Sequence, residues 1–222
     1  MPIKEIVSAD EAIAKTIFDG ATIMVGGFGL VGSPLTLIKA LNRSKAGNFT
    51  IISNNLGEPG RGLGETLRLN KVKRAIGSFF TSNPEVVEAY NNNMLDVELI
   101  PQGTFAEAIR SGGNGIGGFY TPVGVGTLLS KNKELKNIRG KDFVFQEALR
   151  ADIALIKAYK ADKLGNLVYY KTARNFNPIM ATAADIVIAE VDEIREIGDL
   201  NPEEIITPHL YVDYLVLSEE KL

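Results

Sequence analysis

Near the N-terminus an unbroken apolar run meets a cluster of glycines, in the stretch TIMVGGFGLVGSPLTLIKAL over residues 22–41. The run TIMV predicts a strand that is buried on both faces of a sheet. Ser33 and Pro34 are residue types preferred at the N-cap and the first position of a helix. A second apolar run, FTIIS over residues 49–53, follows that helix. Strand, helix and strand in this order predict a parallel βαβ unit with a right-handed crossover.

The same alternation of strands and helices continues along the chain. A first helix is predicted over residues 8–18, because Ser8 and Glu11 have the spacing of a capping box and Gly20 follows as a helix end. Further strands are predicted over residues 74–80, 96–101, 153–162, 185–194 and 211–217, with a strand or hairpin arm over 165–173. The other predicted helices are 83–92, capped by Asn83 and Pro84, 103–113, opened by Thr104 and Glu107, and one that starts near Asn177 and Pro178.

One glycine-rich segment, residues 112–127, fits neither pattern and is predicted to be a long ordered loop. No internal repeat, low-complexity tract or linker divides the 222 residues. The chain is therefore predicted to form a single α/β domain over residues 1–222, with a mostly parallel open sheet and helices on both faces.

Composition removes several classes of function. The chain has no cysteine, which excludes disulfides, cysteine nucleophiles and thiolate metal sites, and the single histidine, His209, argues against a zinc or iron site. The net charge of −3 and the lack of a basic run argue against nucleic acid or a membrane surface as partner. Without a signal peptide or a run of about 18 apolar residues, the protein is expected in the cytoplasm.

The segment GFGLVG from Gly27 has the G-x-G-x-x-G spacing of a dinucleotide-binding loop. That function also requires an acidic residue about 20 positions later, at the end of the second strand, to bind the ribose. The second strand here ends in SNN, and the nearest carboxylate, Glu58, lies beyond it in another glycine-rich loop. An NAD-dependent oxidoreductase of the Rossmann type therefore stays an alternative that the sequence disfavours.

The glycines themselves have a physical meaning without that motif. Gly26, Gly27, Gly29 and Gly32 remove side chains where a strand passes into a helix, so backbone N–H groups at the helix N-terminus can face an anion or an oxyanion. The alternative is that these glycines only permit a tight turn and close packing of helix against sheet.

Two neutral amides, Asn54 and Gln102, each follow a predicted parallel strand. Ligands of open α/β sheets bind beyond the carboxyl ends of the strands, where an amide can hold a carboxylate or thioester oxygen. From position alone, each amide fits equally well as a cap of a turn or helix, and Asn55 fits a cap or left-handed turn better.

The remaining polar candidates are interpreted as surface or structural groups. His209 has no acidic or serine partner nearby in the sequence, and carboxylates on helices and loops are common. Arg174 and Asn175 precede a helix start, where a structural hydrogen bond is the default role. Glu58, Glu65 and Glu147 could each act as a nucleophile or base, but they are interpreted as solvated carboxylates. The chain thus offers anion-binding backbone and amides but no convincing nucleophile.

Several long motifs, in order, resemble the α subunit of family I coenzyme A-transferases. They are DGATIMVGGFGLVGSP, SNN with its glycine-rich loop, VELIPQGTFAEAIRSGGNGIGGFYTPVGVGT, ADIALIKAYKADKLGNLVYYKTARNFNP and IITPHLYVDYLV, and they cover nearly the whole chain. The resemblance implies a transferase in which a glutamate of the β subunit, in a Ser-Glu-Asn-Gly motif, attacks an acyl-CoA thioester. That tetrapeptide is absent from this sequence, in agreement with the missing nucleophile.

The resemblance also implies roles for residues of this chain. Asn54 and Gln102 are expected next to the reacting carboxyl group. Coenzyme A, as a substrate, is expected to contact Gly26, Gly27, Phe28, Gly29, Leu30, Val31 and Gly32. No metal or permanently bound cofactor is implied, and the expected partner is the β subunit in an α2β2 heterotetramer.

The acyl substrate stays open among acetate, acetoacetate, butyrate and succinate. The loop after the asparagines reads LGEPGRGLG and carries Glu58 and Arg61, whereas members acting on succinate and 3-oxo acids often have acidic residues there. A non-catalytic domain that binds a sugar-phosphate effector is the second alternative, because related α/β folds bind such ligands and this chain lacks a nucleophile.

Overall fold

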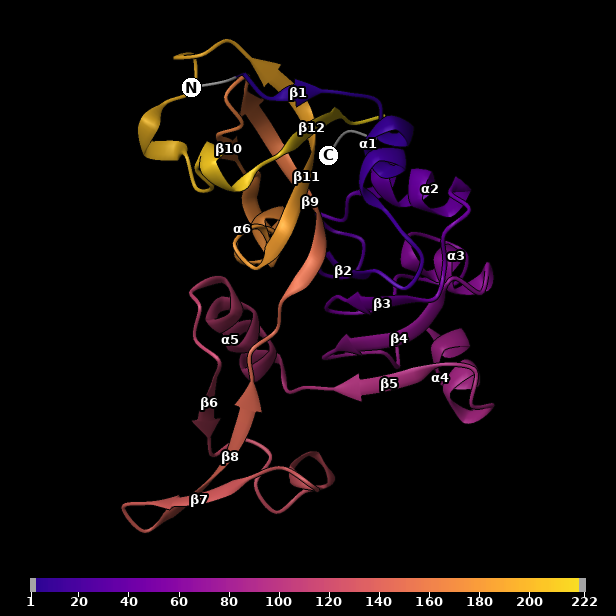
Figure 1. The fold of residues 1–222 in the computed structure, drawn as a ribbon, viewed down its shortest axis with the longest axis vertical. Helices are drawn as coiled ribbons and strands as arrows, with labels where there is room; N and C mark the ends of the chain where they lie inside the picture. Colours follow the sequence, from indigo (N-terminus) through magenta and orange to yellow (C-terminus); the bar gives the residue numbers. More distant parts are fainter. Residues whose placement is uncertain (1–2, 220–222) are drawn as a thin grey trace.

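The computed structural model describes residues 3–219, so both ends of the predicted 1–222 domain lie outside the described residues. Its main sheet is parallel throughout the strand order β1-β12-β11-β9-β2-β3-β4-β5 (Figure 1). Along that order the strands are β1 (Glu5–Ile6), β12 (Tyr214–Leu217), β11 (Ala184–Arg195), β9 (Ala151–Asp162), β2 (Thr22–Val25), β3 (Phe49–Ile52), β4 (Val72–Gly77) and β5 (Asp96–Leu99). A short antiparallel strand, β10 (Leu167–Val168), pairs with β9.

Helices cover both faces of this sheet, as predicted. Successive strand residues point to opposite faces, so Ile23 and Ile51 belong to one hydrophobic core while Met24 and Ile52 belong to the other. The first core is closed by α1 (Ala9–Thr16), α2 (Leu35–Arg43), α3 (Leu63–Arg68) and α4 (Pro84–Asn91). The second is closed by α5 (Gln102–Gly113) and α6 (Asn177–Ala181). The predicted α/β class and the parallel βαβ unit are confirmed.

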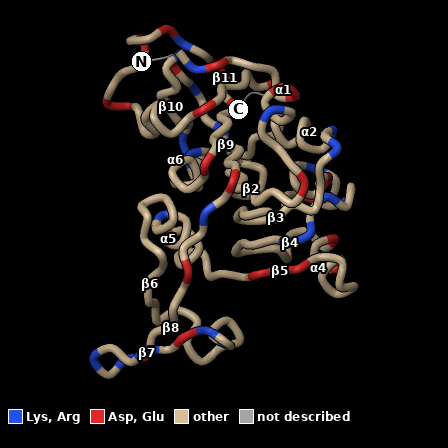
Figure 2. The backbone as a smooth tube through the Cα atoms, viewed as in Figure 1, with Lys and Arg blue, Asp and Glu red and all other residues tan. Residues whose placement is uncertain are grey.

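A second, antiparallel sheet projects from the body of the molecule (Figure 1). It consists of β6 (Gly118–Thr121), β7 (Leu135–Ile138) and β8 (Lys141–Glu147). The prediction of a loop over residues 112–127 is therefore wrong for β6, whose Tyr120 ring packs 5.2 Å from the Phe145 ring of β8. Figure 2 shows basic residues at the tip of this sheet, beside the β7–β8 turn.

Helix starts agree with the sequence where a local side chain caps the helix. Ser8 accepts a hydrogen bond from Glu11 N at the start of α1, and Asn83 accepts one from Glu85 N at the start of α4. The predicted caps of the two other helices are wrong: α2 has Pro34 at its N-cap with no side-chain cap, and α5 starts two residues before Thr104.

Short 3₁₀ turns complete the chain at η1 (Leu128–Ser130), η2 (Lys171–Arg174), η3 (Pro202–Glu204) and η4 (His209–Tyr211). The last of these replaces the first residue of the predicted 211–217 strand, which starts at Tyr214. Within residues 3–219, no helix has the length and apolar character needed to cross a membrane.

Candidate active site

The carboxyl ends of β2, β3, β4 and β5 lie along one edge of the sheet, because these neighbouring strands are parallel. Four polar or glycine-rich segments leave the strands at this edge. They are residues 26–32, here called the glycine loop, Ser53–Asn55, Ser78 and Gln102. Since ligands of open α/β sheets bind beyond this edge, it is the candidate site, and it holds both predicted amides.

Asn54, Asn55, Ser78 and Gln102 form one hydrogen-bonded group, here called the amide cluster. Asn54 Nδ2 donates to Gln102 Oε1 and to Ser78 Oγ, each over 2.9 Å. Ser78 Oγ also donates to Gln102 Oε1. Asn55 Nδ2 donates to Asn54 Oδ1 over 3.0 Å, and Asn55 Oδ1 accepts from the N–H of Gly57 over 2.9 Å. Side chains from three different strand ends are thus locked together.

The direction of these bonds leaves one amide group available. Gln102 Oε1 accepts twice, whereas no hydrogen bond among residues 3–219 uses Gln102 Nε2. Gln102 is exposed, but Asn54 is only 2% exposed and its amide nitrogen already has two acceptors. Gln102 therefore presents N–H donors to the site. The buried Asn54 orients the Gln102 amide by donating to its Oε1.

Gln102 is held by the first turn of α5, with Pro101 as the N-cap residue. Proline suits a helix start because its φ is already fixed and no intrahelical partner exists there for an N–H group. The predicted cap, Thr104, is instead buried inside the helix. The earlier start places Gln102 on a rigid element.

The glycine loop forms a tight turn at its tip. Phe28 and Val31 exchange two backbone hydrogen bonds of 3.0 and 3.2 Å, and Gly29 between them has a φ of 62°. The side chains of Phe28 and Val31 are 54% and 52% exposed. Within the described chain, the N–H groups of Gly29, Leu30 and Gly32 donate no hydrogen bond, but Gly32 is buried, so the two donors at the tip, those of Gly29 and Leu30, remain available to a ligand.

The backbone N–H groups in the first turn of α2 are not available to a ligand. The N–H groups of Thr36 and Leu37 both donate to Glu190 Oε2, over 2.9 and 3.1 Å. The prediction that this helix N-terminus faces a bound anion is therefore wrong for these two groups, because a buried carboxylate of the protein occupies that position. Ser33, the predicted N-cap, instead directs its hydroxyl to Gly26 O over 3.4 Å.

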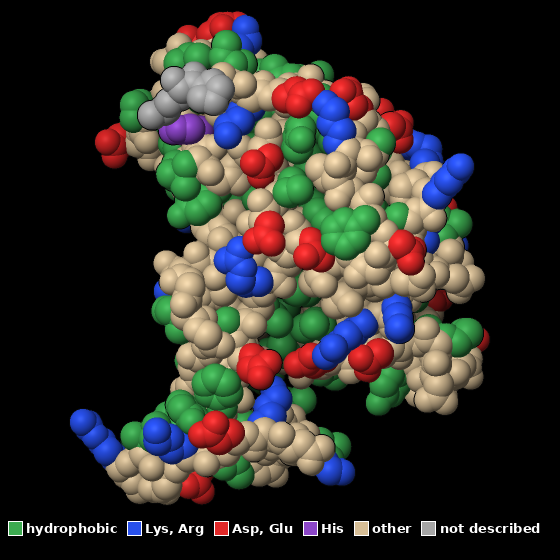
Figure 3. Space-filling model, in the orientation of Figure 1, with side chains coloured by type: hydrophobic (Ala, Val, Ile, Leu, Met, Phe, Trp, Pro, Cys, Tyr) green, Lys and Arg blue, Asp and Glu red, His purple; other side chains and the backbone are tan. Residues whose placement is uncertain are grey.

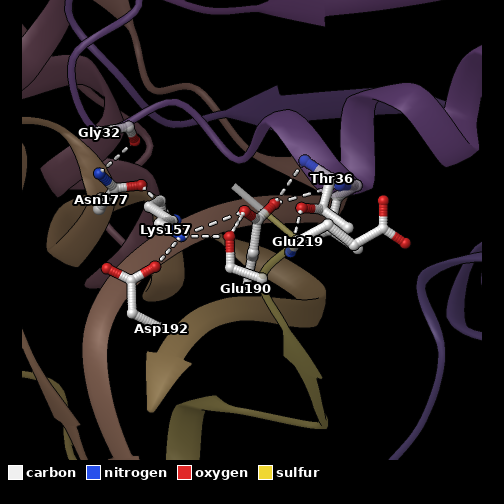
Figure 4. A network of polar contacts seen from close by, with 9 residues as sticks. Gly32, Thr36, Lys157, Asn177, Glu190, Asp192 and Glu219 are labelled. Carbon is white, nitrogen blue, oxygen red and sulfur yellow. Dashed lines mark hydrogen bonds and ion pairs between the residues drawn. The ribbon is translucent and has the colours of Figure 1, made fainter. Parts of the chain in front are cut away.

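Glu190 belongs to a buried ion network with Lys157, Asp192 and Ser218, shown in part in Figure 4. Lys157 Nζ lies 3.2 Å from Glu190 Oε1 and 2.6 Å from Asp192 Oδ1, and it donates to Ser218 Oγ over 2.7 Å. All four side chains are buried. One lysine faces two carboxylates, and the positive end of the α2 dipole offsets the remaining negative charge.

Most other polar candidates lie outside the amide cluster. Glu58 and Arg61 exchange backbone hydrogen bonds in a second turn after β3, and their side chains are exposed. His209 lies in η4, where its backbone N–H donates to Asn166 Oδ1 over 2.9 Å. The predicted structural role is confirmed for Asn175, whose side chain bonds to the glycine loop. Arg174, Glu65 and Glu147 are exposed, on η2, α3 and β8.

Glu147 lines a separate cavity of about 610 Å³ between the main sheet and the projecting sheet. In Figure 3 this face is hollowed at that place, and charged side chains of both signs surround the hollow. Arg74 and Glu98 on its wall pair with each other over 2.6 Å. Among residues 3–219, no group of three or more histidine, cysteine, aspartate or glutamate residues has the arrangement of a metal site.

Comparison with known families decides the identity of the chain. Residues 6–218 match the family described as Coenzyme A transferase. The chain belongs to the coenzyme A transferase family. This confirms the resemblance found in the sequence and identifies the chain as part of a CoA-transferase enzyme.

Curated relatives of this CoA transferase chain match it over most of their length. It is 47% identical over 215 residues to the A subunit of succinyl-CoA:3-ketoacid coenzyme A transferase from Xanthomonas campestris pv. campestris (strain B100), covering 97% of this chain and 89% of the relative. It is 44% identical over 202 residues to the alpha subunit of acetate CoA-transferase from Escherichia coli (strain K12), covering 91% and 92%.

Solved structures share the fold. An acyl-CoA transferase from Escherichia coli O157:H7, in a thioester complex with CoA, superposes with a TM-score of 0.89 at 23% identity. The match covers 99% of this chain but only 50% of that one, so the chain spans about half of that protein. Glutaconate coenzyme A-transferase from Acidaminococcus fermentans gives a TM-score of 0.84 at 18% identity, covering 96% and 75%.

Sequence reasoning missed several polar residues of this transferase chain. Ser78 is a single serine after a strand and carries no distinguishing pattern. Asn177 is read correctly as part of a helix start, but its buried contact with the glycine loop is not visible in the sequence. Lys157, Glu190 and Asp192 leave a clearer signal, because charged residues inside apolar strands of a buried parallel sheet need partners.

Proposed function

We propose that this chain is the α subunit of a heteromeric acyl-CoA:carboxylate CoA-transferase that works by a ping-pong mechanism. The observation that carries the proposal is the unpaired amide donor of Gln102, fixed by Asn54 and Ser78 beside the glycine loop. The relatives that are named as A or alpha subunits of their enzymes support the existence of a partner subunit. In this proposal the partner supplies the nucleophilic glutamate, because the Ser-Glu-Asn-Gly motif is absent from this sequence.

The proposed chemistry explains why the chain supplies amides. A carboxylate oxygen of the partner's glutamate bonds to the thioester carbon, and the C–S bond breaks to release the CoA thiolate and leave an acyl anhydride. The thiolate then attacks the glutamyl carbonyl carbon, which releases the acid and forms a glutamyl-CoA thioester. An acceptor carboxylate reverses both steps. Each attack places negative charge on a carbonyl oxygen, where N–H donors such as those of Gln102 stabilise it.

We assign coenzyme A to the glycine loop as a substrate, with no permanently bound cofactor. The unpaired N–H groups of Gly29 and Leu30 are suited to acceptor oxygens of CoA, and the exposed Phe28 and Val31 are suited to its apolar parts. A solved relative of the same fold holds CoA as a thioester, which supports this assignment.

The partner is proposed to dock beside the amide cluster, in an apolar groove of 620 Å³ that Ser78 helps to line. Phe79, Tyr90, Leu99 and Leu128 expose large apolar surfaces in this groove, and Leu128 is 87% exposed. A partner seated here is continuous with the site and brings its glutamate close to Gln102. An α2β2 assembly is the expected stoichiometry.

Short-chain acids are the proposed substrates, among them acetate, acetoacetate, butyrate and succinate. The relatives at 43 to 47% identity carry names for succinyl-CoA:3-ketoacid, 3-oxoadipate and acetate transfer, so they bracket the acyl group without selecting one. Glu58 and Arg61, exposed in the turn that follows Asn55, are the residues of this chain placed to influence the choice.

Reconstitution tests the proposal directly. The chain is expressed alone and together with the product of the adjacent open reading frame, and CoA transfer from acetoacetyl-CoA or butyryl-CoA to acetate is measured. We expect transfer only in the mixture. Tight sugar-phosphate binding by the chain alone, with no transfer in any mixture, would support the effector-binding alternative instead.

A further inference from the structure

Asn175 holds the glycine loop from a segment almost 150 residues away in the sequence. It follows η2 and has a φ of 23°, which is positive for a residue other than glycine. Such a conformation costs free energy and persists only where surrounding contacts impose it. The contacts in this case are made by the Asn175 side chain itself.

Both stems of the glycine loop bond to this one side chain. Asn175 Oδ1 accepts from the N–H of Gly27, on the stem that leaves β2, over 3.1 Å. Asn175 Nδ2 donates to the carbonyl of Val31, on the stem that enters α2, over 3.0 Å. The same carboxamide also bonds to Phe176 N over 2.6 Å and to Ala173 O over 3.1 Å, which fixes its orientation. Asn175 therefore joins the two stems as a staple.

A second asparagine, Asn177, bonds to one end of the loop at Gly32 and packs against the other end at Gly26. Its Nδ2 donates to Gly32 O over 3.0 Å, and its Oδ1 accepts from Lys157 N over 2.8 Å (Figure 4). A Cβ at Gly26 would lie 1.8 Å from Asn177 Oδ1, and a Cβ at Gly32 would lie 2.3 Å from Ala173 O. The glycines at both ends are thus required by the close approach of the 173–177 segment.

These contacts fix the base of the loop and leave the N–H groups at its tip without partners. The bonds involve Gly27, Val31 and Gly32 O, whereas the N–H groups of Gly29 and Leu30 at the tip have no partner within residues 3–219. A loop held at both stems presents such donors in one arrangement, so a ligand that accepts from them has less ordering to impose on binding.

We propose that Asn175 is a positioning residue that sets the glycine loop for binding of the CoA moiety of the substrate. The inference rests on the proposed function, in which this loop contacts CoA. In this proposal the glycine loop binds the CoA moiety equally in the ground state and in the transition states of acyl transfer. Loss of the staple therefore raises KM for acyl-CoA and leaves kcat nearly unchanged.

The test uses the assembled enzyme with Asn175→Gly, which removes the side chain and tolerates a positive φ better than any other residue. We expect KM for acyl-CoA to rise about tenfold, as the loss of one to two hydrogen bonds implies, with kcat within about twofold. Asn175→Asp keeps the acceptor for Gly27 N but cannot donate to Val31 O. It is isosteric, so it carries the test if the glycine variant does not fold.

Asn93→Gly is the matched control, because Asn93 is exposed at the end of α4 and has a φ of 56°. We expect its KM and kcat to equal those of the wild type. A lower melting temperature of Asn175→Gly with unchanged KM, or a fall in kcat alone, would overturn the positioning role. Absence of CoA transfer in the wild-type assembly would instead contradict the proposed function, so the two failures are distinguishable.

Discussion

The amide cluster at the ends of β3, β4 and β5 carries no formal charge, whereas the buried ion network across β9 and β11 joins three charged side chains. In the network, Lys157 and Glu190 are at most 2% exposed, and each has partners on several elements. In the amide cluster, Gln102 is exposed and keeps an unused donor.

The difference distinguishes polar groups that stabilise the fold from polar groups that are free to take part in a reaction. Charges buried in a sheet attract attention as candidates for catalysis, but these are satisfied by one another and by the first turn of α2. A neutral amide with one free donor at the carboxyl edge is better suited to stabilise charge that appears only during a reaction. Variants of the ion network should therefore lose stability but keep kcat, whereas variants of the amide cluster should lose kcat but keep stability.

Replacing Lys157 with methionine is expected to cause the largest effect. The change leaves Glu190 and Asp192 buried without their cation, which typically costs about 3–5 kcal/mol of unfolding free energy. Denaturant unfolding measures this loss, and kcat should stay near the wild-type value at temperatures where the variant is folded. Lys160→Met on the same strand is the control, because Lys160 is half-buried with a 3.7 Å pair to Glu193 and should lose no more than about 1 kcal/mol. Equal losses in both variants would contradict a special role for the network.

Replacing Gln102 with alanine is expected to have the opposite signature. Loss of one oxyanion donor typically costs roughly 3 kcal/mol in the barrier, so kcat should fall about a hundredfold. Unfolding free energy should change by less than about 1 kcal/mol, because water reaches the exposed position. Steady-state kinetics and denaturant unfolding of the assembled enzyme measure both. Glu107→Gln, a change at a half-buried position on the same helix, should leave kcat unaltered, and an unaltered kcat in Gln102→Ala as well would rule out the proposed role.

The sequence predicted the main sheet well because its signals are local. TIMV and FTIIS are short and mostly apolar runs, a pattern typical of strands that are buried on both faces of a sheet. Asn54 and Gln102 could be predicted as neighbours for a similar reason, since the ends of parallel strands meet at one edge.

The features that escaped prediction depend on distant partners. The start of α2 is satisfied by Glu190, more than 150 residues away, so its local residues Ser33 and Pro34 misplace the cap. The strand β6 lies in a glycine-rich segment and is stabilised by pairing with β8, which no local pattern reveals. Ser78 joins the amide cluster only because β4 lies beside β3 in the sheet.

Ser78 gives a smaller and sharper test of the amide cluster. Its hydroxyl bonds to both Asn54 and Gln102, so Ser78→Ala should loosen the orientation of the Gln102 amide and lower kcat about tenfold. If Ser78 acts through Gln102, the same change should have no further effect in the Gln102→Ala background. A double-mutant cycle on kcat measures this coupling. Additive losses would show that Ser78 acts on the reaction separately from Gln102.

The smallest expected effect concerns a surface ion pair, which is the solvent-exposed counterpart of the buried network. The hydrogen bonds from Arg68 lower the pKa of Glu85, and Arg68 Nε lies 3.0 Å from both carboxylate oxygens. A lowered pKa in the folded state means that the pair stabilises the protein above the unfolded pKa of about 4.3, and that this contribution is lost as the pH falls through the folded pKa. Glu85→Gln should therefore lower the melting temperature slightly at pH 7 and converge with the wild type near pH 3. Glu88→Gln on the same helix, at a residue with no ion pair within residues 3–219, is the control for the change in net charge. A pH-independent difference for Glu85→Gln would mean that the pair contributes nothing through its charge.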